Sequence, residues 1–337
     1  TYGDVEHGMD NYTLRSVSMP MMNNRFAIAK GRNKGFGFML TRPLFDGKIS
    51  IGVDHQETLH SSDVSNPLNA NFLVRNFNHA AKDIQGLFSE WRKATLPWDI
   101  ELGLRLNYAT SDSGKVSNNG LMEMMAMNAM ALETTFNDTD KETRYKNIDW
   151  TLKGAYRYNE NLKLTSALGR KSRTPQYQEL YLWLPMQATG GLADGRNYIG
   201  NINLDHEVGH ELNLGLDITT AKFSFSPQAF YRDVRNYIQG TPSNNQQANM
   251  LSTMMSGQAA LQFNNVDAKL YGIDAAYHWQ ATAQIAVGGN INYTRGQRTD
   301  EQDNLYRIAP ANISLQLSYS ASRFGTTIES IAYRKQS

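Results

Sequence analysis

The sequence predicts an all-β protein, a transmembrane antiparallel β-barrel, and three observations lead to this prediction. Apolar and polar residues alternate with a period of two along most of the chain, which is typical of strands with one apolar and one polar face. These alternating segments run for about 10 to 18 residues, whereas strands in globular proteins average roughly 5 or 6. Short turns alternate with long polar loops, which is the pattern of barrels of the bacterial outer membrane.

The composition agrees with a membrane barrel and excludes several other classes. The 337 residues hold 33 basic and 32 acidic side chains, so there is no electrostatic case for a nucleic-acid partner. The chain has no cysteine, which excludes disulfides and thiolate metal sites within it. Mean hydropathy is −0.52 and no run of about 18 apolar residues occurs, which excludes a transmembrane helix but not a barrel. No signal peptide is visible, so we expect an interior piece of a longer precursor.

The strands follow from the alternation in each segment. In "WDIELGLRLNY" Ile100, Leu102 and Leu104 fall on one face, and Glu101 and Arg105 fall on the other. The same pattern predicts strands at 48–56, 208–218, 269–279, 284–294 and 311–320. About 13 strands can be counted in this way, and the final "IAYRKQS" contains no clear strand.

The connections between strands fall into two kinds. Short turns are predicted at 43–48, 94–99, 157–163 and 219–222, and long polar loops at about 65–80, 112–145, 182–205 and 240–262. Aromatic residues near strand ends are expected to form the two interfacial girdles: Trp98, Tyr108, Tyr158, Trp279, Tyr293 and Tyr319. Because closed bacterial barrels have an even number of strands, we expect residues 1–337 to be part of a larger barrel with a wide, plugged lumen.

The stretch "HEVGHELNLGLDI" contains a match to H-E-x-x-H, the zinc-protease motif, at His206, Glu207 and His210. That motif needs a helix, where positions i and i+4 are neighbours. The residues that follow alternate with a period of two, which indicates a strand. On a strand, His206 and His210 lie roughly 13 Å apart, too far for two ligands that each bind zinc at about 2.0–2.1 Å. We therefore expect no zinc site and no enzyme.

Several motifs of this chain, in their order and spacing, resemble those of the TonB-dependent outer-membrane receptors. They are "RKSRTPQYQELYLWLP", "GNINLDHEVGHELNLGLDI", "AKLYGIDAAYHW" and "RIAPANISLQLSY". The positions that carry the first two are Arg173, Pro175, Glu179, Leu180, Tyr181, Gly200, Asn201, Leu204, Glu207, Glu211 and Leu212. The resemblance covers essentially the whole chain. It implies the C-terminal part of a 22-stranded barrel, without its plug domain and without its last strand.

The opening "YGDVEHGMDNYTLR" and the methionine-rich loops resemble the copper-receptor branch of that family. The resemblance implies a metal site in which an H-x-M pair on the barrel, here His7 and Met9, joins ligands on the absent plug. Residues i and i+2 of a strand project on the same face, about 6.6 Å apart. Thioethers select Cu(I), and imidazole suits copper in either oxidation state. The alternative is a polar strand with a space-filling methionine.

Methionines also concentrate outside the strand pattern. The loop methionines expected to give auxiliary metal capture are Met122, Met124, Met125, Met127 and Met130. Further methionines occur at Met19, Met21, Met22, Met250, Met254 and Met255. The alternative is that the run from 121 to 134 forms a short loop helix, because methionine and alanine favour helices. His55, His60, His79 and His278 are interpreted as ordinary barrel or loop residues.

The resulting hypothesis is TonB-dependent import of copper ions across the bacterial outer membrane. The implied partners are TonB, through the absent N-terminal segment, and outer-membrane lipid with lipopolysaccharide, with the receptor itself a monomer. The alternatives are uptake of an iron-siderophore or another metal chelate, an outer-membrane enzyme such as a barrel protease, and a passive pore. A chelate receptor would line its pocket with aromatic residues and arginines.

Overall fold

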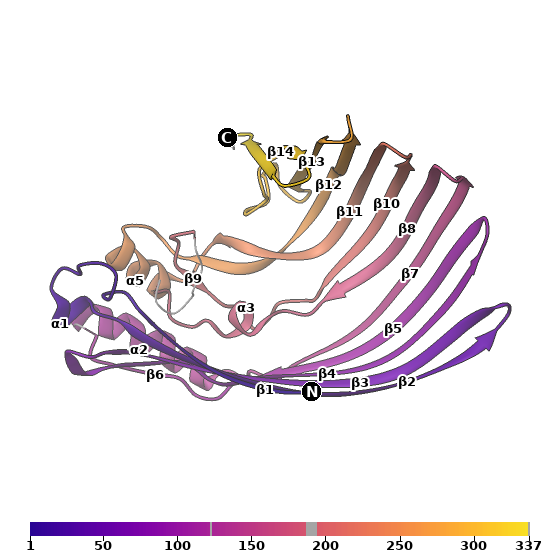
Figure 1. Cartoon of the computed structure of the whole chain (residues 1–337). Helices are drawn as coiled ribbons and strands as arrows, with labels where there is room; N and C mark the ends of the chain where they lie inside the picture. Colours follow the sequence, from indigo (N-terminus) through magenta and orange to yellow (C-terminus); the bar gives the residue numbers. More distant parts are fainter. Residues whose placement is uncertain (122, 187–193, 336–337) are drawn as a thin grey trace.

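The chain folds into one large antiparallel sheet, described by a computed structural model over residues 1–121, 123–186 and 194–335. Fifteen strands belong to this sheet in the described residues, and thirteen of them form one continuous path from β1 to β15. Strands adjacent in this path are also consecutive along the chain, apart from two short strands that lie off it. The path has the strand number that the alternation predicts, and the all-β prediction is confirmed. Figure 1 shows the sheet curving like an open section of a barrel wall.

The helices are short and lie in the connections. The elements of the sheet path are β1 (Tyr2–Asp10), β2 (Phe26–Leu44), β3 (Gly47–Asn66), β4 (Asn69–Thr95), β5 (Trp98–Asp112), β7 (Thr143–Asn159), β8 (Leu162–Arg173), β10 (Glu207–Thr219), β11 (Phe223–Pro242), β12 (Leu261–Gln280), β13 (Ile285–Arg298), β14 (Asn312–Ser320) and β15 (Gly325–Tyr333). The remaining elements are α1 (Pro20–Asn23), β6 (Ser117–Asn119), α2 (Glu123–Asp138), α3 (Tyr177–Tyr181), β9 (Tyr198–Ile199) and α5 (Gln246–Ser256).

One face of the sheet is an exposed apolar belt. Leu104 on β5 is 50% exposed, Leu214 on β10 is 53% exposed and Ile273 on β12 is 51% exposed, although each belongs to an alternating apolar row. Leaving such a side chain in water instead of burying it costs about 1.5–3 kcal/mol. A belt of this kind across a whole sheet therefore requires an apolar solvent, which is the lipid-facing surface of a transmembrane barrel. Within the described residues, no helix combines the length and apolar character needed to cross a bilayer.

The opposite face is polar and carries ion pairs between strands. Arg105 on β5 donates from both terminal guanidinium nitrogens to Asp54 on β3, with N···O distances of 2.7 Å. Strand β4 lies between these two strands and contributes Gly86, which stands in register with both Asp54 and Asn107. A Cβ atom at Gly86 would lie 2.2 Å from Arg105 Nη2 and 2.7 Å from Asp54 Oδ1. Because Gly86 has no side chain, the Asp54–Arg105 ion pair can pass over strand β4.

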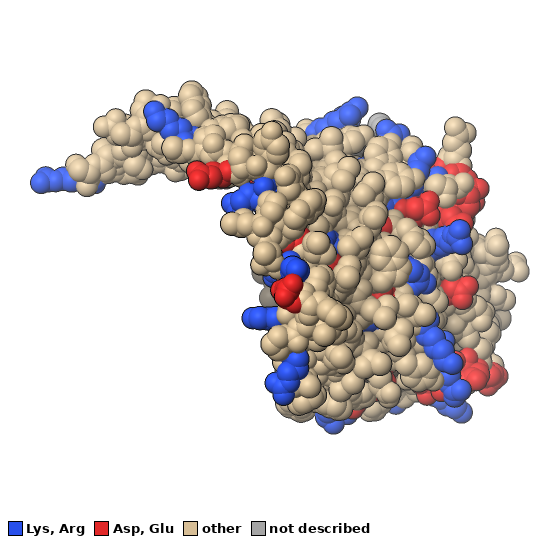
Figure 2. Space-filling view, turned by 90° about the vertical axis from the view of Figure 1, so that its right-hand side faces the viewer, with Lys and Arg blue, Asp and Glu red and all other residues tan. Residues whose placement is uncertain are grey.

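The two rims of the sheet differ as the sequence predicts. The connections at 45–46, 96–97, 160–161, 220–222, 281–284 and 321–324 are short and lie at one rim, and the helices lie at the other (Figure 1). Figure 2 faces the short-turn side, where acidic and basic side chains are intermixed over a largely uncharged surface.

Two predictions of the local structure are wrong. Residues 65–80 were expected to form a long loop, but β3 and β4 continue through most of this stretch and are joined at 67–68. The C-terminal segment, in which no clear strand was expected, forms β15 and pairs with β14 from Gly325 to Tyr333. In both places the side chains on the outer face are partly polar, so the alternation of apolar and polar residues is weak.

The predicted aromatic girdle at the short-turn rim has exposed members at the strand ends. Trp98 begins β5 and is 53% exposed, and Trp279 near the end of β12 is 50% exposed. Tyr158 and Tyr319 occupy the corresponding ends of β7 and β14 and are also exposed. Trp98 packs on Tyr156 of β7 with ring centroids 4.5 Å apart. Amphipathic rings at this level suit the boundary between lipid and water.

Gly86→Ala tests the passage of the Asp54–Arg105 pair over β4. The added methyl group would displace the guanidinium from its bidentate geometry, so we expect unfolding to become easier by about 1–2 kcal/mol. The measurement is the urea midpoint of the protein in detergent micelles.

Gly37→Ala on β2 is the matched control for this substitution. Its Cβ would have no neighbour closer than 3.7 Å, although Gly37 also stands in register with Asp54. Equal midpoints for the two variants would show that Gly86 has no such role.

Candidate metal centre

His7 and Met9 lie on β1 and share one face of the sheet. The register places His7 opposite Ala29 of β2 and Met9 opposite Ala27. The same alternation on β2 places Gly37 opposite Asp54 of β3, so the H-x-M pair lies on the polar face. Both residues are exposed, and the small alanines beside them leave the imidazole and thioether accessible. The predicted strand and shared face are therefore confirmed, while the metal role of the pair stays a prediction.

The row that contains His7 and Met9 continues into the first long loop at Asn11. The Asn11 backbone N–H donates to the Arg25 carbonyl at 3.2 Å, which extends the β1–β2 ladder by one bond. The Asn11 side chain accepts from the Arg25 N–H at 2.8 Å and donates to the Asn23 carbonyl at 3.0 Å. Asn11 thus closes the loop of residues 11–25 and fixes where Arg25 begins the return strand.

Asn11 also lines a cleft of about 640 Å³ among the long loops. From here on we call it the loop cleft, and define it by Asn11, Arg15, Asn23, Arg25, Met125, Met186, Gly195, Asn197, Met254, Met255 and Ser256. Four of these residues are methionines, contributed by α2, by α5 and by the segment after α3. The cleft therefore begins two residues beyond Met9 and gathers thioethers from distant parts of the chain.

An apolar cluster between the loops holds these methionines in place. Met186 is 8% exposed and belongs to the cluster, while Met125 and Met255 pack against its edge. Helix α5, which carries Met254 and Met255, is fixed at both ends. The Asn245 side chain accepts from the Ala248 N–H at its start, and Gly257 adopts a left-handed φ of 74° at its end. Such caps stabilise a short helix that would not persist alone.

Other loop methionines form an exposed stripe. Met124, Met127 and Met130 follow one another at intervals of three on α2 and are 62%, 66% and 63% exposed. Met124 also lines a second, mainly apolar hollow together with Met250 and Met254 of α5. The helix of the alternative interpretation is thus confirmed, but its methionines do not pack only on one another. Met122 lies outside the described residues.

Imidazole and carboxylate side chains do not gather into a metal-binding group of three or more in the parts of the chain that the structure describes. Within them, no group of three or more His, Cys, Asp or Glu side chains could hold a metal ion. His60 is instead stacked on Tyr177 with ring centroids 4.2 Å apart, as expected for an ordinary structural histidine. Sulfur is therefore the ligand type that these loops concentrate.

The H-E-x-x-H match is part of a strand and not of a helix. Strand β10 begins at Glu207, directly after His206, and runs through His210. His206 packs against the ring of Tyr145 with centroids 6.1 Å apart. Glu207 accepts from Arg173 and from the Ile238 backbone N–H at 2.9 Å. Its carboxylate is thus held by structural hydrogen bonds. Because the motif lies on a strand, His206 and His210 are not one helical turn apart, as the zinc-protease motif requires.

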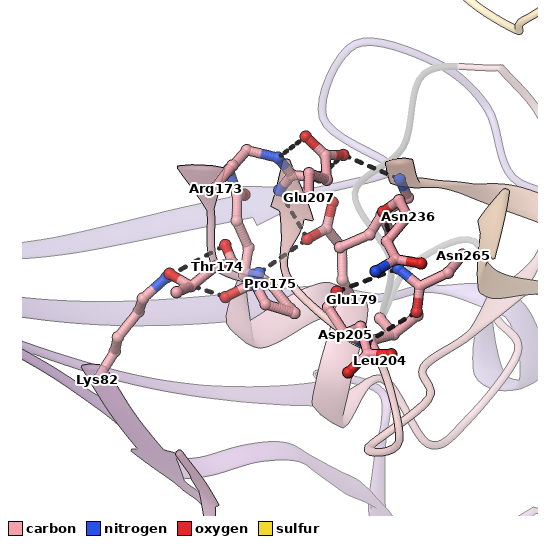
Figure 3. Close-up of polar contacts among 12 residues, drawn as sticks. Lys82, Arg173, Thr174, Pro175, Glu179, Leu204, Asp205, Glu207, Asn236 and Asn265 are labelled. Carbon is pink, nitrogen blue, oxygen red and sulfur yellow. Dashed lines mark hydrogen bonds and ion pairs between the residues drawn. The ribbon is translucent and has the colours of Figure 1, made fainter. Parts of the chain in front are cut away.

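The receptor-like motif residues surround this carboxylate and anchor the loop of residues 174–206 (Figure 3). Arg173 at the end of β8 bonds Glu207 through Nε at 2.8 Å and Nη2 at 2.6 Å, and Glu179 through Nη1 at 2.8 Å. Both carboxylates are largely buried, with 13% and 14% of their side-chain surface exposed. Glu179 also accepts from the Gln176 N–H and so forms the capping box of α3. One guanidinium therefore joins β8, α3 and β10.

Further bonds complete the anchorage of this loop. Lys82 of β4 donates to the Pro175 carbonyl at 2.9 Å, as Figure 3 shows. Tyr181, which is fully buried, donates its hydroxyl to the Lys141 carbonyl at 3.0 Å. Burial raises the pKa of the Tyr181 phenol, which keeps it protonated and able to donate. Gly200 approaches the backbone of α3 so closely that a Cβ would lie 2.6 Å from the Leu180 carbonyl oxygen.

The sequence predicts some of these candidate residues but not how they come together. It identified His7, Met9 and the methionines of α2 as candidates, but not the loop cleft that unites α2 with α5. Met186 and the two arginines of the cleft carried no signal, because a single methionine or arginine in a loop has no periodic context. Their proximity depends on contacts between segments more than one hundred residues apart.

Comparison with known proteins places the chain among outer-membrane receptors. Residues 2–336 match the family described as "TonB dependent receptor-like, beta-barrel". No curated protein matches the chain significantly in sequence.

Solved structures with the same fold include three transporters or receptors. The copper transporter OprC has a TM-score of 0.74 and 18% identity, with 97% of this chain and 47% of that chain covered. The ferric citrate transporter FecA has a TM-score of 0.58 and 11% identity, with 90% and 42% covered. The alcaligin outer-membrane receptor FauA from Bordetella pertussis has a TM-score of 0.53 and 13% identity, with 91% and 46% covered. The chain thus spans about half the length of these proteins.

Replacement of Arg173 by methionine tests the anchorage of the 174–206 loop. It would leave two largely buried carboxylates without their cation, and we expect a loss of about 2–3 kcal/mol in the free energy of unfolding, with faster proteolysis of this loop. The triple variant Arg173→Met/Glu179→Gln/Glu207→Gln removes the charges together and should recover most of the loss. A triple variant as unstable as Arg173→Met would argue against charge as the cause.

Proposed function

The chain belongs to the TonB-dependent receptors, and we propose that within this family it forms the barrel wall of a copper importer. The family consists of transporters rather than enzymes, and its members are outer-membrane proteins of Gram-negative bacteria. Localisation to the outer membrane agrees with the apolar belt and the aromatic rim. We further propose that transport depends on TonB, which would act through a plug domain, and that the receptor works as a monomer embedded in lipid and lipopolysaccharide.

One observation carries the choice of copper. The row of His7, Met9 and Asn11 leads directly into a cleft where Met125, Met186, Met254 and Met255 come together. Thioether sulfur is a soft ligand that favours Cu(I) over hard cations such as Mg²⁺ or Ca²⁺. The loop cleft contains no carboxylate among its described lining residues, so it lacks the anionic oxygen donors that sites for Fe(III), Mn²⁺ or Ca²⁺ commonly use.

The arrangement supports a stepwise passage of the ion. Met124, Met127 and Met130 are exposed on α2 and would make the first contacts. The loop cleft would hold the ion next, and the H-x-M pair on β1 would receive it on the polar face of the sheet. Two ligands on one strand leave coordination positions open, and we propose that groups of the plug complete the site.

Uptake of a ferric chelate is the second candidate. Two of the similar structures are the ferric citrate transporter FecA and the alcaligin receptor FauA. The loop cleft also contains Arg15 and Arg25, which agrees with the arginines expected of a chelate receptor. Binding of a ferric chelate without any binding of copper would favour this candidate.

The double substitution His7→Ala/Met9→Ala tests the copper site directly. Both side chains are exposed on a regular strand, so the fold should persist while tightly bound copper is lost. The measurement is the copper content of the intact receptor by elemental analysis after equilibration with copper and removal of the excess. Equal copper in the variant and in the unchanged receptor would contradict the assignment of this pair.

The methionines of the loop cleft need a separate test with Met125→Leu/Met254→Leu. Leucine conserves volume and apolar character, so stability should change by less than about 1.5 kcal/mol. We expect Cu(I) binding by the loops to weaken about tenfold because two soft donors are lost. Competition with a chromogenic Cu(I) chelator measures the affinity.

Met39→Leu is the control for that double variant, because Met39 lies on β2 near the short-turn rim and far from the loop cleft. If Met39→Leu weakens Cu(I) binding as much as the double variant does, the loop cleft is not the binding site.

A further inference from the structure

We propose that the loop cleft binds its metal as an anionic complex, with the thioethers facing the metal and the guanidinium groups of Arg15 and Arg25 holding the anionic ligands. This inference rests on the proposed function and specifies the chemical form of the cargo. The proposed cargo is a soft metal ion surrounded by anionic ligands such as thiolates, thiosulfate or carboxylate-bearing chelators.

Arg25 lines the loop cleft and is held in place by several contacts. Its Nη1 atom donates to the carbonyls of Met22 and Asn24 at 2.7 and 2.8 Å. The guanidinium carbon lies 4.0 Å from the centre of the Phe72 ring, and Phe72 is buried. The group is thus held by one edge and one face, and its other nitrogens remain available to a ligand in the cleft. A preorganised guanidinium is well suited to anionic oxygen or sulfur donors.

The two arginines of the cleft have no carboxylate beside them among its described lining residues. Arg25 is partly buried, and burial alone lowers the pKa of its guanidinium, with no carboxylate acting against this effect. Arg15, on the same loop, donates from Nε to the Asn11 carbonyl at 3.1 Å. Neither arginine forms an ion pair within the described part of the chain, whereas Arg105, Arg173 and Arg232 on the sheet all pair with carboxylates. Among the described residues that line it, the cleft therefore has two cationic side chains and no anionic one.

A bare cation and an anionic complex would interact with these two guanidinium groups in opposite ways. Two unit charges 4 Å apart interact by about 1 kcal/mol in water and about 4 kcal/mol near a protein surface. A free Cu(I) ion among Met125, Met254 and Met255 would be repelled by both guanidinium groups of the same cleft. An anionic complex would be attracted by the same groups, while its polarizable metal still contacts sulfur. The combination of soft donors with unpaired cations favours the complex.

Silver provides redox-stable probes for the two chemical forms. Ag(I) resembles Cu(I) in its preference for sulfur, and it can be supplied as silver nitrate in chloride-free buffer or as the anionic dithiosulfato complex. Binding of each probe to the intact receptor is measured by equilibrium dialysis. The variants are Arg15→Gln, Arg25→Gln and the charge-conserving Arg25→Lys. Arg42→Gln serves as the control because Arg42 lies near the short-turn end of β2 and Arg25 directly precedes the other end.

The expected effects have opposite signs for the two probes. Loss of a charged hydrogen bond should weaken binding of the anionic complex about tenfold or more in Arg15→Gln and Arg25→Gln. Binding of the bare Ag(I) ion should stay equal or become tighter, because a repelling charge is gone. Arg25→Lys should retain most of the affinity for the complex, and Arg42→Gln should change neither probe. A misfolded variant would lose both, so the exposed Arg15→Gln then carries the test alone.

Each of the following results would overturn the inference. Unchanged binding of the anionic complex in Arg15→Gln would show that the guanidinium does not hold it, and parallel losses for both probes in Arg15→Gln would show a structural effect. If the unchanged receptor binds bare Ag(I) and rejects the complex, copper import survives and only this inference fails. If the unchanged receptor binds neither probe, the proposed function fails as well.

Discussion

Strand pairing is the constraint on which the rest of this structure depends. Lipid offers no partner to a backbone N–H or carbonyl group, so every strand that crosses it must be hydrogen-bonded to its neighbours. The pleat then fixes which side chains face lipid and which face the interior. A charge on the inner face must find its partner across the sheet, as Arg105 does when it reaches Asp54 over Gly86. Polarity, ion pairing and the position of the H-x-M row all follow from this geometry.

Because of the same constraint, the hydrophobic core lies mainly among the long connections. The wall of the barrel buries little apolar surface against the protein, since its apolar face is turned to lipid. The buried clusters lie among the long connections instead, where Leu180, Tyr181 and Leu184 are almost inaccessible. Arg173 anchors this region to β8 and β10 through two carboxylates. The loops are consequently an ordered body that can hold side chains at defined positions, which a metal cleft requires.

The sequence predicted the structural features that depend on residues close together along the chain. The alternation in 98–108 predicted β5, and the i, i+2 relation placed His7 and Met9 on one face, because both are local consequences of the pleat. It failed at 65–80, since β3 and β4 extend beyond the apolar belt and alternation there no longer separates lipid from water. The loop cleft was also beyond prediction, because Arg25, Met125 and Met254 meet only through the folded loops. Local patterns have no access to such contacts.

The exposed thioethers on α2 have a chemical consequence apart from metal selectivity. Oxidants convert methionine to its sulfoxide, which replaces a polarizable sulfur donor by a hard oxygen and introduces a polar, chiral group. Met124, Met127 and Met130 are more than half exposed, whereas Met186 is protected inside the apolar cluster. Oxidative stress would therefore disable the outer thioethers first and leave the inner one intact. The surface that we propose to collect a soft metal would in this sense also be the part of the receptor that oxidants reach first.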